Sequence, residues 1–394
     1  MAQIYNAPKV GVAGNQSSIG PQFNTHYWDR KSLMDAAEEM FFSPLADVKS
    51  MPKHYGKELK VFYYVPLLDD LNVSDQGLDA AGADTSDAGL YMGSRDVGTI
   101  SGKMPTLTED GGRVNRVGFT RLERTGQIAE YGFFTEFTED SLMFDTDSEL
   151  YGHLSREMLR GANEINEDLL QIDLLNAADV KVFGGTATDV DEVSGASGAE
   201  TLLTKTDLQK MSIILDDNRT PKKTTIIKGS RMTDTKVISA SRIAYIGSEL
   251  QIMFTEMSGY VPVEQYADAA TIMNGEIGAI PGAHLRIVVV PQMMHWAGAG
   301  AAEGTNAGYQ VTGGNYDVAP ILVVGDESFA TIGLQGMGGK GKQKFRIIVK
   351  KPGVERADYR DPYGKLGFSS ISFWYGFIKL RGERIAVAYS PIPE

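Results

Sequence analysis

One uninterrupted helical pattern, over residues 138–178, constrains this chain more than any other stretch. Thr138 is suited to cap a helix with two acidic residues in its first turn, and a second start signal follows at 146–149. We therefore predict a short helix and then a long one. Apolar residues at steps of three and four predict one packing stripe along the long helix: Leu150, Leu154, Met158, Ala162, Ile165, Leu169 and Ile172.

The length of this helix sets the scale of the molecule. No proline interrupts residues 148–178, so at the usual rise the helix is about 46 Å long. A compact chain of 394 residues has a radius of gyration of only about 21 Å. One helix would therefore cross nearly the whole molecule, and we expect it to act as a spine on which other elements lie.

Two strand-like runs flank a segment that is poor in large apolar residues. Residues 58–65 are rich in β-branched and aromatic side chains, and residues 113–137 alternate polar and apolar side chains over much of their length. Residues 71–104 between them would make an unusually long loop for a compact domain. We predict a projecting β-hairpin with 71–104 at its tip, covered by neighbouring subunits because long bare strand edges promote aggregation.

The remaining chain reads as a mixture of helices and strands. Residues 1–28 are either an extended arm or a disordered tail, and Asp29 caps a predicted helix through Phe42. A helix capped at Thr206 and Asp207 is expected to reach about Asp217, with Leu208, Met211 and Leu215 on one face. Residues 241–254 mix both signals, residues 296–318 are an expected surface loop, and strands are predicted at 224–228, 285–291, 321–324, 344–349, 370–380 and 384–388.

Composition excludes several classes of function. The net charge of −13 and pI near 5.0 do not suit a protein that grips nucleic acid over its whole surface. The absence of cysteine excludes disulfides, thiolate chemistry and cysteine-based zinc sites. The N-terminus lacks the basic start and apolar run of a signal peptide, and no apolar stretch is long enough to span a bilayer. We expect a soluble protein with no membrane partner.

No catalytic, cofactor-binding or metal-binding residues stand out. Residues 336–342 match two glycine-rich phosphate-binding patterns, but both need a helix to begin there and the following residues read as a strand. The five histidines do not form a metal-binding spacing, and His153 is better explained as a packing or interface residue. We expect no enzyme and no cofactor. The alternative is a soluble carbohydrate-active or nucleotide-using enzyme, because paired carboxylates need not be neighbours in sequence.

One basic cluster is a candidate binding surface. Lys340, Lys342, Lys344 and Arg346 alternate along the chain, so on a strand all four would share one face. That face could meet DNA phosphates, or the acidic stretch 136–149 of a neighbouring subunit. A solvated surface is an equally good interpretation.

The order of these parts and several short motifs resemble a known family. The motifs lie at 51–64 (MPKHYGKELKVFYY), 106–109, 131–142 (YGFFTEFTEDSL), 241–246, 266–268, 274–278, 285–291 and 361–367. The layout is similar to that of Hong Kong 97 type phage capsid proteins. The motifs, by their order rather than singly, resemble the major capsid protein family of N4-like tailed bacteriophages. The insertion at 69–104 and the loop at 297–317 depart from that pattern.

The resemblance implies an α+β fold of the Hong Kong 97 type in five parts. These are an N-terminal arm and short helix (1–50), an extended β-hairpin loop (51–137), a peripheral domain with the spine helix (138–220), an axial domain (221–343) and returning strands (344–394). It further implies a major capsid protein whose hexamers and pentamers form an icosahedral shell around double-stranded DNA, first as a precursor that then expands.

The implied partners are therefore other copies of the chain, DNA bound non-specifically on the inner face, and portal, decoration and separate scaffolding proteins. The implied location is the virion capsid, after assembly in the cytoplasm of a bacterial host.

Overall fold

The computed structural model describes residues 40–52, 54–64, 119, 121–144, 150–222, 224–227, 235–238, 241–263, 275–334, 345–353, 357 and 359–394. The predicted N-terminal arm, nearly all of the predicted helix 29–42, and the hairpin tip at 71–104 lie outside them.

The body of the molecule is built on one sheet. Among the described residues this sheet has seven strands, in the order β4-β17-β13-β7-β10-β9-β8. Every residue of β7, β13 and β17 is buried, because helices cover both faces of the sheet. Helices α3 (Lys205–Asp217) and α4 (Gln251–Glu256) pack on one face, and the end of α2 packs on the other. The strands are β4 Val180–Phe183, β7 Arg242–Gly247, β8 Val261–Pro262, β9 Glu276–Ile280, β10 Leu285–Val290, β13 Val318–Val324 and β17 Ile385–Pro391.

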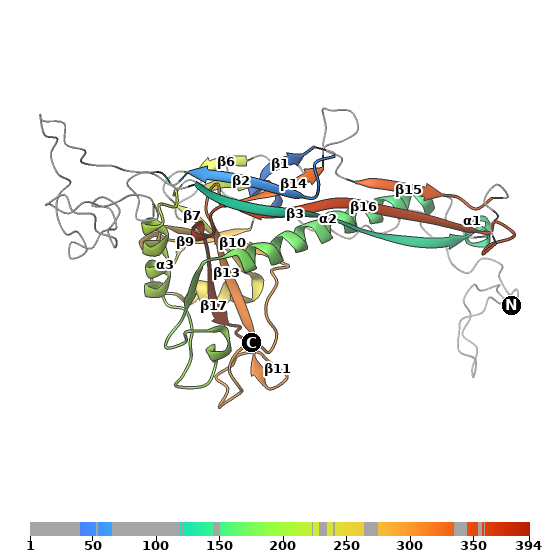
Figure 1. Ribbon diagram of the computed structural model, residues 1–394. Coiled ribbons are helices and arrows are strands. Elements are labelled where there is room, and N and C mark those ends of the chain that lie inside the picture. The colour runs from blue at the N-terminus through green and yellow to red at the C-terminus, as the bar shows by residue number, and fades with distance from the viewer. Residues whose placement is uncertain are drawn as a thin grey trace, which may run out of the picture.

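A second sheet extends away from this body (Figure 1). Over the described residues it holds six strands, in the order β1-β14-β16-β3-β2 with β15 also paired to β16. Strands β3 and β16 run antiparallel from the pair Thr138–Leu366 to the pair Gln127–Phe377. The strands are β1 Asp47–Met51, β2 Glu58–Tyr64, β3 Arg121–Thr138, β14 Phe329–Leu334, β15 Arg346–Lys350 and β16 Leu366–Lys379.

Smaller elements complete the chain. Two short hairpins pair β5 with β6 and β11 with β12. These strands are β5 Thr224–Ile227, β6 Thr235–Ile238, β11 Val311–Thr312 and β12 Asn315–Tyr316, and the 3-10 helices are η1 Ser43–Leu45, η2 Val190–Glu192, η3 Ser248–Leu250, η5 Pro281–Ala283 and η7 Gly382–Arg384.

The predicted pair of helices is confirmed. Helix α1 (Glu139–Phe144) comes first, and the backbone N–H of Ser141 donates to Thr138 Oγ1 over 3.2 Å. Helix α2 (Leu150–Ala177) has 28 residues and is about 42 Å long. It starts beneath the extended sheet and ends against the body, so it joins the two parts (Figure 1).

The packing stripe predicted along α2 holds only for its first half. There Met158 and Ala162 are buried and Leu154 is partly buried. In the second half Leu169 is partly buried, but the side chains of Ile165 and Ile172 are 37% and 44% exposed. The prediction that these two isoleucines pack within the chain is therefore wrong. The second half instead buries a different set, Glu167, Leu170, Gln171, Leu174 and Leu175.

The reason is that the second half of α2 lies between two sheets. Its newly buried face packs against the body, while Asp173 on the other side still accepts a hydrogen bond from Tyr375 of β16. At 3.6 residues per turn, the two buried sets are centred about 180° apart around the helix axis. A single periodic stripe cannot describe a helix that gains a second buried face midway. The side chain of Leu150, also in the predicted stripe, lies outside the described residues.

The predicted hairpin pairing is confirmed, with one correction. Strands β2 and β3 pair antiparallel from Glu58–Gln127 to Tyr64–Arg121. From Gln127 to Thr138, however, β3 pairs with β16 of the same chain. The expectation that only neighbouring subunits cover this strand is therefore wrong for 127–138, because the strand that covers it comes far downstream in the sequence.

The predicted strands at 224–228, 285–291, 321–324, 344–349, 370–380 and 384–388 are all present with shifted ends. Helix α3 is present too, but its N-cap is Thr204 rather than Thr206. The Thr204 hydroxyl and Asp207 form a capping box there, and Leu208, Met211 and Leu215 are buried as predicted. The strands that were not predicted are β1, β4, β6, β8, β9, β11, β12 and β14.

Candidate assembly interface

The part of the extended sheet farthest from the body exposes much apolar surface. We call this part the outer arm: β15, residues 366–375 of β16, residues 129–138 of β3, and α1. Large apolar side chains that solvent reaches on or beside it are Tyr131, Phe134, Met143, Ile347, Ile348, Val349, Tyr359, Tyr363 and Leu366. Such a concentration of exposed apolar side chains marks a surface that meets another protein.

The strand register divides the outer arm into two different faces. Ile347, Ile371 and Phe133 lie in one row across the three strands, and this row faces α2, where Ile371 is buried. The next row, Ile348, Ser370 and Phe134, lies on the opposite face, where the Phe134 side chain is 64% exposed. The spine therefore supports one face, and the other is open in the isolated chain.

An aromatic contact joins two strands of the inner face, and a hydrogen bond joins this face to the spine. The Tyr131 and Phe373 rings stack at 6.0 Å between centroids. The Tyr375 hydroxyl donates to Asp173 Oδ2 of α2 over 2.6 Å. Burial raises the pKa of the Asp173 carboxyl, and burial and then the neighbouring Asp173 raise the pKa of Tyr375. The arm is thereby held in a defined position relative to α2.

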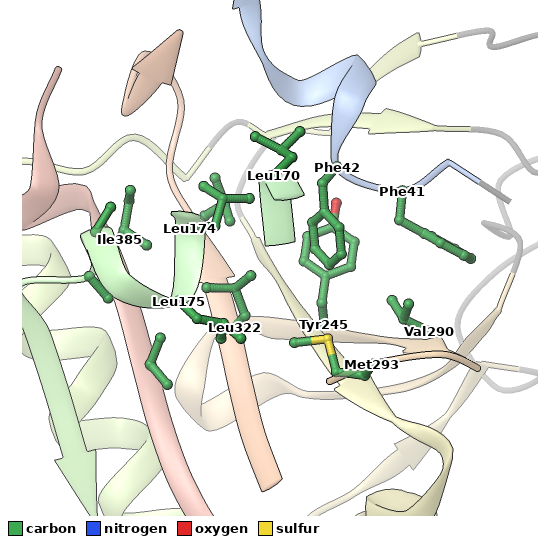
Figure 2. Close-up of a cluster of buried hydrophobic side chains, with 14 of the residues drawn as sticks. Phe41, Phe42, Leu170, Leu174, Leu175, Tyr245, Val290, Met293, Leu322 and Ile385 are labelled. Atoms are coloured by element: carbon green, nitrogen blue, oxygen red, sulfur yellow. The ribbon is translucent and has the colours of Figure 1, made fainter. Parts of the chain in front are cut away.

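A buried carboxylate on α2 holds the N-terminal end of the described chain. Glu167 Oε1 accepts the backbone N–H of Phe42 over 2.6 Å, and Oε2 accepts from the backbone N–H of Ser43 over 3.2 Å and from its hydroxyl. Burial raises the pKa of Glu167, although these hydrogen bonds oppose the shift. The Phe42 ring packs edge-on against Tyr245 at 5.2 Å, beside Leu170 (Figure 2).

Sequence reasoning missed this role of Glu167. Its only signal is its position on the face that the second half of α2 buries, which the predicted stripe did not include. The contact fixes Phe42 and Ser43 against the spine.

The described beginning of the hairpin also exposes aromatic side chains. Phe62, Tyr64 and Phe119 are all exposed, and the last two rings contact at 5.7 Å. The Arg121 guanidinium lies 4.6 Å from the Phe62 ring centroid. Lys60 and Glu123 form an exposed ion pair at 2.7 Å across the two strands, which contributes little to stability. The hairpin thus offers a contact surface at its base as well.

The predicted basic cluster is described at one residue only. Arg346 is the first residue of β15 and is exposed, whereas Lys340, Lys342 and Lys344 lie outside the described residues. The same is true of the glycine-rich run 336–342. The segment that follows that run is strand β15 and not the helix that a phosphate-binding loop requires.

The described residues do not form a recognisable metal site. No group of three or more His, Asp or Glu side chains among them is arranged to hold a metal ion. Of the histidines, His54, His284 and His295 lie apart on the chain, and His295 sits 3.9 Å from Glu249. Over the same part of the chain, no helix has the length and apolarity needed to cross a membrane.

Comparisons with known proteins agree on one family. The sequence model of the family described as phage capsid protein matches residues 122–374. The chain is 50% identical over 390 residues to the major capsid protein of Pseudomonas phage KPP21, covering 97% of this chain and 96% of that one.

Solved structures show the same fold at low sequence identity. The capsid structure of Helicobacter pylori bacteriophage KHP30 is 10% identical, with a TM-score of 0.52 over 98% of this chain and 100% of that one. The capsid asymmetric unit of cyanophage Pam1 is 11% identical, with a TM-score of 0.51 over 98% of this chain and 100% of that one.

Proposed function

Because the chain belongs to the phage capsid protein family, we propose that it is the principal subunit of an icosahedral phage head, assembled as hexamers and pentamers. The family is structural, so the alternative of a carbohydrate-active or nucleotide-using enzyme is rejected. The observation that carries the proposal is the outer arm, whose large apolar side chains remain exposed in a single chain and are therefore available for contact with other subunits.

The finer assignment is to the Hong Kong 97 type of capsid fold and to the N4-like tailed phages. In its support, the chain has a long helix beneath an extended sheet and a separate body with a central sheet. The proposed parts are the arm (1–50), hairpin loop (51–137), peripheral domain (138–220), axial domain (221–343) and returning strands (344–394). Because β3 pairs with β16, the second and last parts contribute strands to one sheet, and this sheet packs against the spine helix.

The proposed mechanism of assembly is overlap between subunits. The hairpin loop of one subunit lies across the spine of a neighbour, where Ile165 and Ile172 offer exposed apolar contacts on one line of the helix. Each such contact is weak, but a closed shell repeats it at every interface. The N-terminal arm, which departs from the contact at Glu167, reaches another neighbour.

The proposed partners follow from this role. Copies of the chain bind one another, double-stranded DNA is enclosed without sequence-specific contact, and scaffolding, portal and decoration proteins join during assembly in a bacterial host. The basic cluster Lys340, Lys342, Lys344 and Arg346 would meet either DNA phosphates or acidic residues of a neighbour.

The direct test is to purify the chain, alone and with the scaffolding protein of its phage, and to examine it by size-exclusion chromatography and negative-stain imaging. We expect capsomers or closed shells of uniform size. A chain that stays monomeric under both conditions at concentrations where related capsid proteins assemble would contradict the proposal.

A further inference from the structure

Two open strand edges bound the outer arm. Strand β15 pairs with β16 on one side, and no described strand pairs with its other side. Strand β3 also pairs with β16, while β2 covers its other side only as far as Gln127. Over 129–138 no described strand uses that second side. Unpaired main-chain groups along such edges are ready to bind a further strand.

The edge at β15 is apolar and flanked by cations. All five of its residues are exposed, and Ile347, Ile348 and Val349 form an uninterrupted β-branched apolar run. Arg346 and Lys350 stand at its two ends, with the Lys350 ammonium 5.5 Å from the Phe368 ring centroid. A short apolar run of this kind tends to aggregate unless another strand pairs with it. Because cations stand at both ends of the run, the edge fits a strand that carries acidic residues.

The open edge of β3 carries those acidic residues. Glu130 and Glu136 are exposed on it and flank the exposed ring of Phe134. Within the described residues, neither glutamate forms an ion pair, and neither does Arg346. The two edges of the arm therefore both carry apolar side chains and are opposite in charge, and residues 129–138 are long enough to accommodate the five residues of β15.

We propose that β15 of one subunit pairs with residues 129–138 of β3 in a second copy of the chain, which makes one continuous sheet of two outer arms. This inference rests on the proposed shell function and names a contact within it. Pairing β15 with another β15 would bring cations together, and pairing β3 with another β3 would bring acids together. The charges therefore favour a head-to-tail contact, the kind that closes into rings.

The direction of the pairing follows from the sheet. Strands β15 and β3 are each antiparallel to β16, so they run parallel within one arm. A second copy added in the same orientation presents its β3 parallel to β15 of the first. The arms then repeat in the order β3, β16, β15 across the interface.

The geometry allows a crosslinking test that reports only on contacts between copies. Ile348 and Phe134 share a row across β16, so their Cα atoms lie about 9.6 Å apart, two strand spacings. A disulfide spans at most about 7 Å between Cα atoms, so these two positions cannot be bridged within one chain. The chain has no cysteine of its own to interfere.

The first experiment oxidises assembled particles of Ile348→Cys/Phe134→Cys and separates the chains by non-reducing electrophoresis. We expect a ladder of dimers, trimers and longer multimers, because each chain can link to two neighbours. Each single cysteine variant gives at most dimers. To allow for register, Glu130→Cys and Glu136→Cys replace Phe134→Cys in two further pairs. Normal particles with no ladder in any of the three pairs overturn the inference while leaving the shell function intact.

A second experiment uses charge and needs no crosslink. Reversing one edge, by Arg346→Glu/Lys350→Glu or by Glu130→Lys/Glu136→Lys, is expected to lower particle yield about tenfold through like-charge contact. Combining all four substitutions restores opposite charges and is expected to restore the yield. The contact is refuted if the combined variant, melting like the parent chain, assembles no better than the single-edge variants.

Discussion

The body and the outer arm are both built on β-sheets, yet the body buries its central strands whereas the outer arm leaves strand faces and edges exposed. Strands β7, β13 and β17 are buried along their whole length, with helices on both faces of their sheet. Strand β15 is exposed along its whole length and has one described neighbour. The body is stabilised within one chain, whereas the arm keeps its apolar surface for contacts between chains.

The change expected to affect assembly most is deletion of residues 71–104. Because this segment is predicted to be the hairpin tip, its loss should abolish shells and leave the melting temperature of the purified subunit within a few degrees of the parent. Imaging and thermal melting measure the two effects. If the shortened chain fails to fold, the segment belongs to the core and the division between body and projecting parts is wrong.

The largest effect on the single chain is expected in the body. Leu322→Ala truncates a side chain of β13 that is 0% exposed and leaves a cavity in the core. Such a cavity lowers the free energy of unfolding by about 2–5 kcal/mol. The matched change Ile348→Ala in β15, 37% exposed, should cost less than about 1 kcal/mol. Denaturant unfolding of both variants checks this. Equal losses would remove the contrast between the two regions.

A third prediction concerns the exposed line on the spine. Ile165→Ser/Ile172→Ser should lower shell yield severalfold while the unfolding free energy changes by less than about 1 kcal/mol. The control is Ile213→Ser on α3 of the body, where the side chain is 58% exposed. If the control lowers yield as much as the spine variant, exposure on the body matters as much as exposure on the spine.

A smaller effect is expected from the pH dependence of Glu167. Burial raises its folded-state pKa, so the contribution to stability is fully present below the ordinary glutamate pKa and is lost as pH rises through the raised value. Glu167→Gln removes this titration. Between pH 4 and pH 8, the parent should therefore lose stability relative to the variant, as followed by thermal melting. A constant difference across this range would show that Glu167 has an ordinary pKa in the folded chain.

The smallest effect is expected from Lys340→Ala/Lys342→Ala/Lys344→Ala. If the cluster meets DNA, particle yield stays normal and nuclease-protected DNA per particle falls. If it meets a neighbour's acidic residues, yield falls instead. When both quantities match those of the parent, the cluster is an ordinary solvated surface.

Local signals in the sequence predicted individual elements well. The cap of α1 at Thr138, the succession of α1 and α2, the buried run of β10 and the hairpin pairing of β2 with β3 all follow from residues close together in the chain. The exposed β-branched run of β15 is also visible in the sequence. Its place as an edge strand is not, because that depends on pairing with β16.

What sequence reasoning missed depends on distant parts of the chain. The covering of β3 by β16 and the burial of Glu167 against Phe42 and Ser43 both join segments far apart in sequence. The error at Ile165 and Ile172 has the same origin, because the buried face of the second half of α2 depends on where the distant body sheet lies. Periodicity reveals that a helix has an apolar face but not where a second buried face begins.

The second buried face of α2 has a mechanical consequence. A rod that contacts one sheet along its first half and lies between two sheets along its second half is held more firmly in the second, so bending and torsion concentrate where the second contact begins, between Ala162 and Glu167. If a shell changes its curvature or diameter, that span is where each subunit has to yield. Amide hydrogen exchange in this turn should therefore respond first to such a change.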